Sequence, residues 1–276
     1  MKKWIKGFAI GFLALGLVAC SDTADVKPGT DESKTSDLTI EKVFEKAQAA
    51  SEKLESMHAN MDINQNISAP DLDLDMESVI KLDMDIVQEP LEMHQVMEMG
   101  MGEEGSANIE MYMTEEGFFM KDPESGAWMK LPSEFYEDLT ASMSAGADPT
   151  LDLASLEKFV DDFTFEQNDN EYILKLKASG EKFNELVQDQ LAEMEGIGAA
   201  ETGVLEDMKI HQLDYEIYLD KETFNTTAFN MVMDMEMEDG GSTVRISQDI
   251  KAKISNINEL KEIVVPQEIL DSAVEQ

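Results

Sequence analysis

From Met57 onward, apolar residues alternate one by one with polar residues through most of the chain. In residues 57–113 the apolar positions are mainly Met, Ile and Leu, and the residues between them are mainly acids and amides. A period of two predicts β-strands with one apolar and one polar face. Short connections, such as Glu115–Gly117, predict antiparallel hairpins. The alternation returns in later runs over residues 118–131, 172–176, 213–219, 229–237 and 244–254.

Helical spacing is confined to a few segments. Apolar residues recur every three or four positions in residues 40–54, which predicts a helix capped by Asp37 or Thr39. Three further helices are predicted over residues 133–143, 153–163 and 179–194. Because crossover helices between successive strands are missing, the predicted fold class is α+β with one large antiparallel sheet. The helices are too few and too short to fill a wide, curved sheet, so we expect a cavity on its apolar face.

The first twenty residues predict export and lipid anchoring. Three lysines precede an uncharged run, Gly7–Ala19, that is too short to cross a bilayer as a helix. This pattern is typical of a secretory signal peptide, here residues 1–19. The tetrapeptide LVAC at residues 17–20 resembles the lipobox of bacterial lipoproteins. The resemblance implies cleavage before Cys20 and a diacylglyceryl group on its sulfur, and the alternative is an uncleaved anchor with an incidental cysteine.

A polar segment follows the predicted lipidation site. Residues 21–38 include Pro28 and Gly29 and have almost no apolar content. We therefore expect residues 20–38 to form a lipidated, flexible tether and residues 39–276 to form the folded domain. The domain would then be lipid-anchored to the cell membrane at its extracytoplasmic face.

Charge and cysteine content exclude several classes of protein. The 59 acids and 21 basic residues give a formal net charge of −38. Such a surface repels nucleic-acid phosphates, so a nucleic-acid partner is excluded. Cys20 is the single cysteine, which leaves no internal disulfide and no cysteine-based zinc site. Hydrophobic residues make up 42% of the chain, which is enough for a core.

No motif in the sequence predicts catalysis. Asp71, Asp73 and Asp75 begin like an EF-hand loop, but Met76 and Leu82 stand where glycine and glutamate are required. The chain has no G-x-S-x-G sequence, and its one thiol is assigned to the anchor. We therefore expect a protein that is not an enzyme and that needs no cofactor or metal.

Methionine is unusually frequent, with 20 residues, many on the apolar side of alternating strands. One interpretation is core packing, because the flexible thioether fills irregular gaps. A second is a deformable lining for a greasy ligand. A third is binding of a soft metal such as Cu(I), although the three histidines are scattered along the chain.

Four stretches together resemble a known family. They are the opening helix with its long following strand, YMTEEGFFMKDPESGAWMKL (Tyr112–Leu131), YLDKETFNTTAFNMVMDM (Tyr218–Met235), and the closing strand that leads to VVPQEIL (Val264–Leu270). Residues 39–270 resemble the LolA-like superfamily, and most closely the surface lipoproteins of Gram-positive bacteria related to LppX and LprG. The resemblance implies an incomplete barrel, with helices covering its concave face, that holds acyl chains of lipids and has no catalytic residues.

These observations lead to one expected function and one runner-up. We expect a membrane-anchored extracytoplasmic lipoprotein that binds an apolar ligand, a lipid or acyl chains, between sheet and helices. The runner-up is an anchored interaction or sensor domain with a closed core, whose protein partner the sequence does not reveal. The predicted lining residues are Met93, Met97, Met111, Met113, Phe118, Trp128, Leu186, Val187, Leu191, Tyr215, Phe229, Met231, Met233 and Met235.

Overall fold

The computed structural model describes residues 23–100, 105–132, 156, 159–178, 209–239 and 241–275. Several sequence predictions fall outside these residues. They are the signal peptide, Cys20, the helices expected over residues 133–143 and 179–194, and the lining residues Leu186, Val187 and Leu191.

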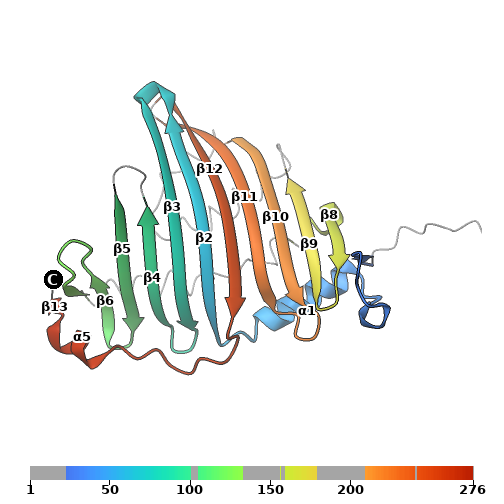
Figure 1. The fold of residues 1–276 in the computed structure, drawn as a ribbon, viewed down its shortest axis with the longest axis horizontal. Coiled ribbons are helices and arrows are strands. Elements are labelled where there is room, and N and C mark those ends of the chain that lie inside the picture. Colours follow the sequence, from blue (N-terminus) through green and yellow to red (C-terminus); the bar gives the residue numbers. More distant parts are fainter. Residues whose placement is uncertain are drawn as a thin grey trace, which may run out of the picture.

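The described strands form one wide, curved sheet that does not close into a barrel (Figure 1). Their order is β1-β8-β9-β10-β11-β12-β2-β3-β4-β5-β6-β7-β13. All neighbours are antiparallel except the pairs at the two edges, β1 with β8 and β13 with β7, which are parallel. The bounds are β1 (Asp25–Val26), β2 (Ser56–Ala69), β3 (Leu74–Val87), β4 (Glu92–Gly100), β5 (Ser106–Thr114), β6 (Gly117–Lys121), β7 (Trp128–Leu131), β8 (Phe163–Gln167), β9 (Glu171–Ala178), β10 (Lys209–Asp220), β11 (Thr226–Asp239), β12 (Ser242–Ser255) and β13 (Val274–Glu275).

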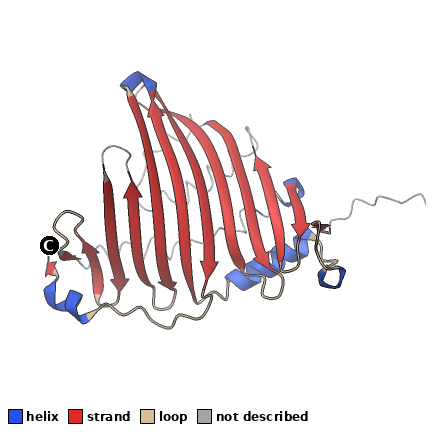
Figure 2. Ribbon diagram, in the orientation of Figure 1, coloured by secondary structure: helices blue, strands red, loops and turns tan. Residues whose placement is uncertain are grey.

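Helices are few among the described residues (Figure 2). The two α-helices are α1 (Ile40–Ser51) and α5 (Gln267–Ser272), and short 3-10 turns are η1 (Glu32–Lys34), η2 (Pro70–Leu72) and η4 (Val160–Asp162). The helix predicted from residue 40 is confirmed, and Thr39 is its N-cap residue, although the Thr39 side chain makes no capping hydrogen bond. No helix among the described residues has the length and apolar content that a bilayer crossing requires.

Antiparallel pairing of alternating strands is confirmed, and three strands are additional to those predicted: β8 and the two short edge strands β1 and β13. The segment expected to be helical up to Phe163 instead begins strand β8 at that residue. Phe163 and Phe165 point to the same side of β8 and pair with Leu176 and Leu174 of β9. Burial of these two aromatic side chains in a sheet outweighs the helical spacing of the apolar residues before them.

The register sorts the side chains onto two faces. Directly paired residues point to the same side of a sheet, so each cross-strand row belongs to one face. One such row runs through Met231, Ile250, Ile63, Ile80 and Met99. We call the side that carries this row the apolar face and the opposite side the polar face. Among the paired strand positions, the apolar face carries Asp, Glu, Lys, Arg or His at one place, Asp239 at the end of β11.

Helix α1 packs on the apolar face at the β8–β10 end of the sheet. The rings of Phe44 and Phe163 meet edge to face with centroids 5.4 Å apart. Val43 is completely buried, and Phe44 is 2% exposed, in one cluster with Leu174 and Ile217. This cluster fixes α1 to the sheet and forms one half of the core.

Residues 23–38 do not form the free tether that their composition predicted. Thr23 bridges to Thr39, and β1 pairs with β8 at the edge of the sheet. The buried side chain of Gln167 donates hydrogen bonds to the backbone oxygens of Ala24 and Ser36, each at 3.1 Å. The described part of this segment is therefore integral to the domain.

The C-terminal segment crosses the polar face at the other end of the sheet. Val265 and Ile269 are 2% and 4% exposed, in a cluster with Tyr112 and Phe119. The backbone N–H of Ile263 donates to a carboxylate oxygen of Glu92 at 2.7 Å, and β13 extends the sheet beside β7. We call residues 263–275 the C-terminal strap.

Candidate functional site

The candidate site is the broad central part of the apolar face, built by the long strands β11, β12, β2, β3 and β4. Beside the row that contains Ile63, a second row runs through Phe229, Ala252, Met61, Leu82 and Met97. Each strand supplies every second residue to this face, because successive side chains alternate in direction. The result is a continuous surface of aliphatic and thioether groups that spans five strands.

Burial differs along the strands. Four methionines are 6% exposed or less at one end of these strands, where β2 and β4 begin and β3 and β5 end. They are Met57, Met84, Met93 and Met113. In the central rows the side chains of Ile63, Ile80, Met97, Met231 and Ile250 are half-buried. Near the η2 end, Met76 is 44% exposed. The apolar face therefore passes from closed core to accessible surface along each long strand.

Gln95 of β4 lies on the apolar face beside Met84 and Met111, and a row of uncharged polar side chains crosses three other strands of this face. Gln248, Gln65 and Ser78 are directly paired across β12, β2 and β3. The Ser78 hydroxyl donates to the Gln65 side-chain oxygen at 3.5 Å. These groups donate and accept hydrogen bonds without carrying charge. We call them the amide row.

Tyr215 adds another polar atom to this face without adding charge. It lies on β10 and is 6% exposed, in the cluster under α1. Burial raises the pKa of its phenol to about 12. The ring is therefore neutral at physiological pH, which agrees with the uncharged character of the cluster under α1.

The structure brings most of the predicted lining residues together on one face. The register places ten of them on the apolar face: Met93, Met97, Met111, Met113, Phe118, Tyr215, Phe229, Met231, Met233 and Met235. Met93, Met113, Phe118 and Tyr215 are buried in the core clusters, so they support the face rather than form its accessible part.

Trp128 is on the wrong face for the predicted lining. It pairs with Lys121, while its neighbours Met129 and Leu131 belong to the apolar face. Its ring packs against Tyr112 and the C-terminal strap on the polar face. The accessible part of the apolar face instead includes Ile63, Ile80 and Ile250, which the sequence analysis placed on strands but did not select as lining.

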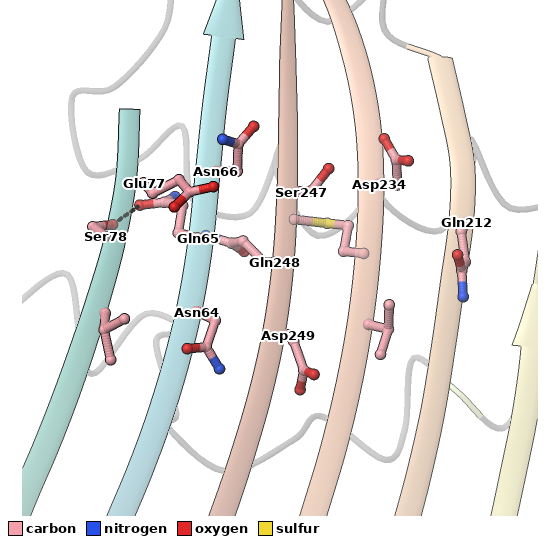
Figure 3. Close-up of a pocket in the computed structure, with 13 residues that line it drawn as sticks. Asn64, Gln65, Asn66, Glu77, Ser78, Gln212, Asp234, Ser247, Gln248 and Asp249 are labelled. Atoms are coloured by element: carbon pink, nitrogen blue, oxygen red, sulfur yellow. Dashed lines mark hydrogen bonds between the residues drawn. The ribbon is translucent and has the colours of Figure 1, made fainter. Parts of the chain in front are cut away.

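A shallow hollow of about 410 Å³ lies over the same strands (Figure 3). Most of its lining positions belong to the polar face, so it is distinct from the predicted apolar cleft. Asp234 accepts two hydrogen bonds from the guanidinium of Arg245, at 2.8 Å and 2.5 Å, and this bond lowers the pKa of the Asp234 carboxyl. The lining residues are Asn64, Gln65, Asn66, Glu77, Ser78, Val79, Gln212, Val232, Met233, Asp234, Ser247, Gln248 and Asp249.

The side chains of His58 and His94 lie on the polar face. His58 on β2 has its Nδ1 2.7 Å from a carboxylate oxygen of Asp85 and its Nε2 3.1 Å from the side-chain oxygen of Asn60, both within hydrogen-bond distance. His94 stacks on Tyr112 with ring centroids 4.2 Å apart. Within the part of the chain that the structure describes, no three His, Cys, Asp or Glu side chains are grouped so that they could hold a metal ion.

Comparison with solved structures finds distant matches. LppX, a lipoprotein of Mycobacterium tuberculosis, is 11% identical, with 82% of this chain and 98% of that chain covered and a TM-score of 0.35. A DUF1329 family protein from Desulfovibrio piger is 7% identical, with 83% and 95% covered and a TM-score of 0.23. A β-barrel-like DUF1849 protein from Brucella abortus is 8% identical, with 72% and 98% covered and a TM-score of 0.20. LppX is thus a structural neighbour at low similarity.

A family model covers most of the chain, which defines its family. None of the curated proteins matches it. One family model, described as "Family of unknown function (DUF6612)", matches residues 39–274, which include α1, α5 and the strands from β2 to β12. The chain belongs to this family of unknown function, DUF6612.

Proposed function

We propose that the accessible part of the apolar face binds the acyl chains of a lipid, without catalysis, in a lipoprotein anchored through Cys20 outside the cell. The observation that carries this proposal is the apolar surface over β11, β12, β2, β3 and β4, whose central side chains are uncharged and half-buried. In a chain with 59 acids, five adjoining strands that keep every charge except Asp239, at the end of β11, on the other face indicate an apolar contact surface.

The driving force would be burial of hydrocarbon. Each buried methylene contributes roughly 0.8 kcal/mol, so a single acyl chain can gain several kcal/mol on such a surface. Methionine side chains such as Met97 and Met231 are unbranched and adapt to chains of different length and unsaturation. The amide row would hydrogen-bond the ester groups of the lipid, since Gln248, Gln65 and Ser78 offer both donors and acceptors.

The ligand test is native mass spectrometry of the soluble domain, purified from its own host without detergent. We expect a bound lipid whose mass disappears after organic extraction. Ile63→Asp places a charge in the middle of the apolar face and should remove the lipid, because a buried carboxylate without a partner is costly. Asn64→Asp introduces the same residue one position along β2, on the polar face, and should leave the lipid bound.

A second substitution keeps the test decisive if Ile63→Asp fails to fold. Met76→Asp lies on the same face at a position that is 44% exposed, so the fold tolerates it more readily. Lipid loss in Met76→Asp, with an unchanged circular dichroism spectrum, supports the proposal. A wild-type domain without any lipid, or equal lipid in wild type and in both apolar-face variants, contradicts it and favours the closed interaction domain.

The anchor is tested separately. Cys20→Ala should abolish incorporation of labelled fatty acid and release the protein from the membrane fraction or leave it unprocessed. Two acyl chains give stable anchoring where one chain gives only marginal binding. If Cys20→Ala stays in the membrane at the mature size, the anchor proposal is wrong.

A further inference from the structure

We infer that residues 23–38 hold the domain directly on the lipid surface, with the β1–β8 edge of the sheet next to the membrane. The inference rests on the proposed lipid anchor at Cys20. The free connection between Cys20 and the domain would then be a few residues long, in place of the long flexible tether that composition predicts.

The segment joins the domain at its first described residue. Thr23 bridges to Thr39, immediately before α1. Ala24 is 7% exposed and belongs to the same core cluster as Val43 and Phe44. The chain therefore joins the domain at Thr23, three residues after Cys20, and enters the core at Ala24.

The side chain of Gln167 fixes this segment at both of its ends. Gln167 is 2% exposed, and its amide nitrogen donates to the backbone oxygens of Ala24 and Ser36, each at 3.1 Å. Its side-chain oxygen accepts from the backbone N–H of Ser36 at 2.9 Å and from Lys221 Nζ at 2.8 Å. A buried amide with four such bonds is costly to withdraw, because each group would lose its partner inside the protein.

Lys221 ties the middle of the segment to the same place. Its Nζ also donates to the backbone oxygens of Lys34 and Asn168, at 2.8 Å and 2.6 Å. The backbone N–H of Asp31 donates to a carboxylate oxygen of Asp169 at 2.7 Å. The start, middle and end of the segment are thus all bonded to the β8–β9 region. We call these contacts the clamp.

The clamp sets the reach of the anchor. Three residue steps from Cys20 to Thr23 span about 10 Å at most when fully extended. A free chain over residues 20–38 would extend to about 60 Å. The edge that carries β1 and β8 therefore stays within about 10 Å of the lipidated sulfur.

The width of the sheet and its charge favour an orientation in which the β1–β8 edge lies at the membrane and the opposite edge points away from it. Nine strand spacings separate β8 from β6, so β6 lies about 43 Å from β8 along the sheet at about 4.8 Å per spacing. The net charge of −38 opposes close contact of the acidic polar face with anionic lipids. The core cluster under α1 then lies at the membrane end of the apolar face.

The experiment measures fluorescence energy transfer from a donor dye on the lipidated full chain to acceptor-labelled headgroups in phosphatidylglycerol vesicles. The chain has no other cysteine, so Asn170→Cys in the β8–β9 turn and Glu124→Cys in the β6–β7 turn can each be labelled alone. We expect several-fold higher transfer from position 170 than from position 124. A flexible Gly/Ser linker of about 18 residues between Asp22 and Thr23 should abolish this difference. The same linker between Asp71 and Leu72, in η2, should leave the difference unchanged.

Each outcome decides between the claims. Equal transfer from the two positions in a protein that pellets with the vesicles overturns the inference and leaves the anchor intact. A protein that acquires no lipid at Cys20 and does not pellet overturns the anchor and, with it, the inference. If the difference in energy transfer between positions 170 and 124 persists after linker insertion before Thr23, the inferred short connection to Cys20 is also wrong.

Discussion

The indole ring of Trp128 lies 5.8 Å, centroid to centroid, from the phenol ring of Tyr112, on the side of the sheet opposite to the methionine rows. Ile269 of the C-terminal strap is buried in the same cluster. This end of the sheet is therefore apolar on both sides, and the strap covers the second side.

Loss of one strap contact should expose this cluster. Ile269→Asp places a charge in a position that is 4% exposed, and we expect the strap to detach. Trp4 and Trp128 are the two tryptophans, so in a chain without residues 1–19 the fluorescence reports Trp128 alone. Its emission should shift to longer wavelength in Ile269→Asp. Gln267→Asp, an exposed position of α5, should leave the emission unchanged, and a shift of equal size there would contradict the strap assignment.

The two ends of the apolar face should differ in their contribution to stability. Met113 is completely buried, and Met113→Ala should lower the free energy of unfolding by about 2–5 kcal/mol. Met76 is 44% exposed, and Met76→Ala should cost less than about 1 kcal/mol. Urea unfolding of the ligand-free domain measures both values. Equal losses would show that the face is equally closed along its length.

The clamp predicts a local change in protease sensitivity. Gln167→Ala removes four hydrogen bonds and takes the partner from the buried backbone oxygen of Ala24 and from half-buried backbone groups of Ser36, at a cost of about 1–3 kcal/mol. We expect rapid proteolysis within residues 23–38 while the rest of the sheet stays resistant. Gln212→Ala, an exposed position of β10, provides the control. A segment that is cut equally fast in wild type and in Gln167→Ala would mean that Gln167 does not hold it.

His58 should make stability depend on pH near neutrality. Burial lowers the pKa of His58, but the hydrogen bond to Asp85 and the charges of Asp83 and Asp85 together raise it above its ordinary value. The protonated ring therefore stabilises the folded state below about pH 6.5, and this contribution is lost as pH rises through the raised pKa.

The measurement compares urea midpoints at about pH 6 and about pH 8. His58→Gln should remove part of the decrease that the wild type shows between these values. Asp85→Asn removes the nearest charge and should lower the pKa of His58 in an NMR titration. An unchanged pKa in Asp85→Asn would contradict the assigned cause.

Strand positions and the face of most side chains could be predicted from the sequence because each long strand has one charged and one apolar set of residues. In β2 and β3, for example, Asp62 and Lys81 face away from Met61 and Leu82. Trp128 could not be assigned in this way. In β5, β6 and β7 both sides carry aromatic or apolar residues, with Tyr112, Phe119 and Trp128 on one side and Met113, Phe118 and Met129 on the other. Lys121 and Lys130 share the side of Trp128, but β7 has only four residues, and the strap that covers Trp128 is distant in sequence.

The structure of residues 23–38 depends on contacts with residues distant in sequence, which local composition does not reveal. Ala24 and Ser36 meet Gln167 more than 130 residues along the chain. A single buried amide converts a polar segment into part of the sheet, and no periodic pattern marks such a residue. Strand β8 has a weak local signal, since Phe163, Phe165 and Gln167 alternate, but the helical spacing before it conceals the change of period.

A greasy surface made largely of thioethers carries a chemical liability. Peroxide converts methionine to its sulfoxide, which is polar and cannot replace the original side chain against hydrocarbon. Met76, at 44% exposure, would be attacked before Met113, which is completely buried. Oxidation would therefore erode the accessible rows first and leave the folded core intact, and sulfoxide reductases could reverse the damage.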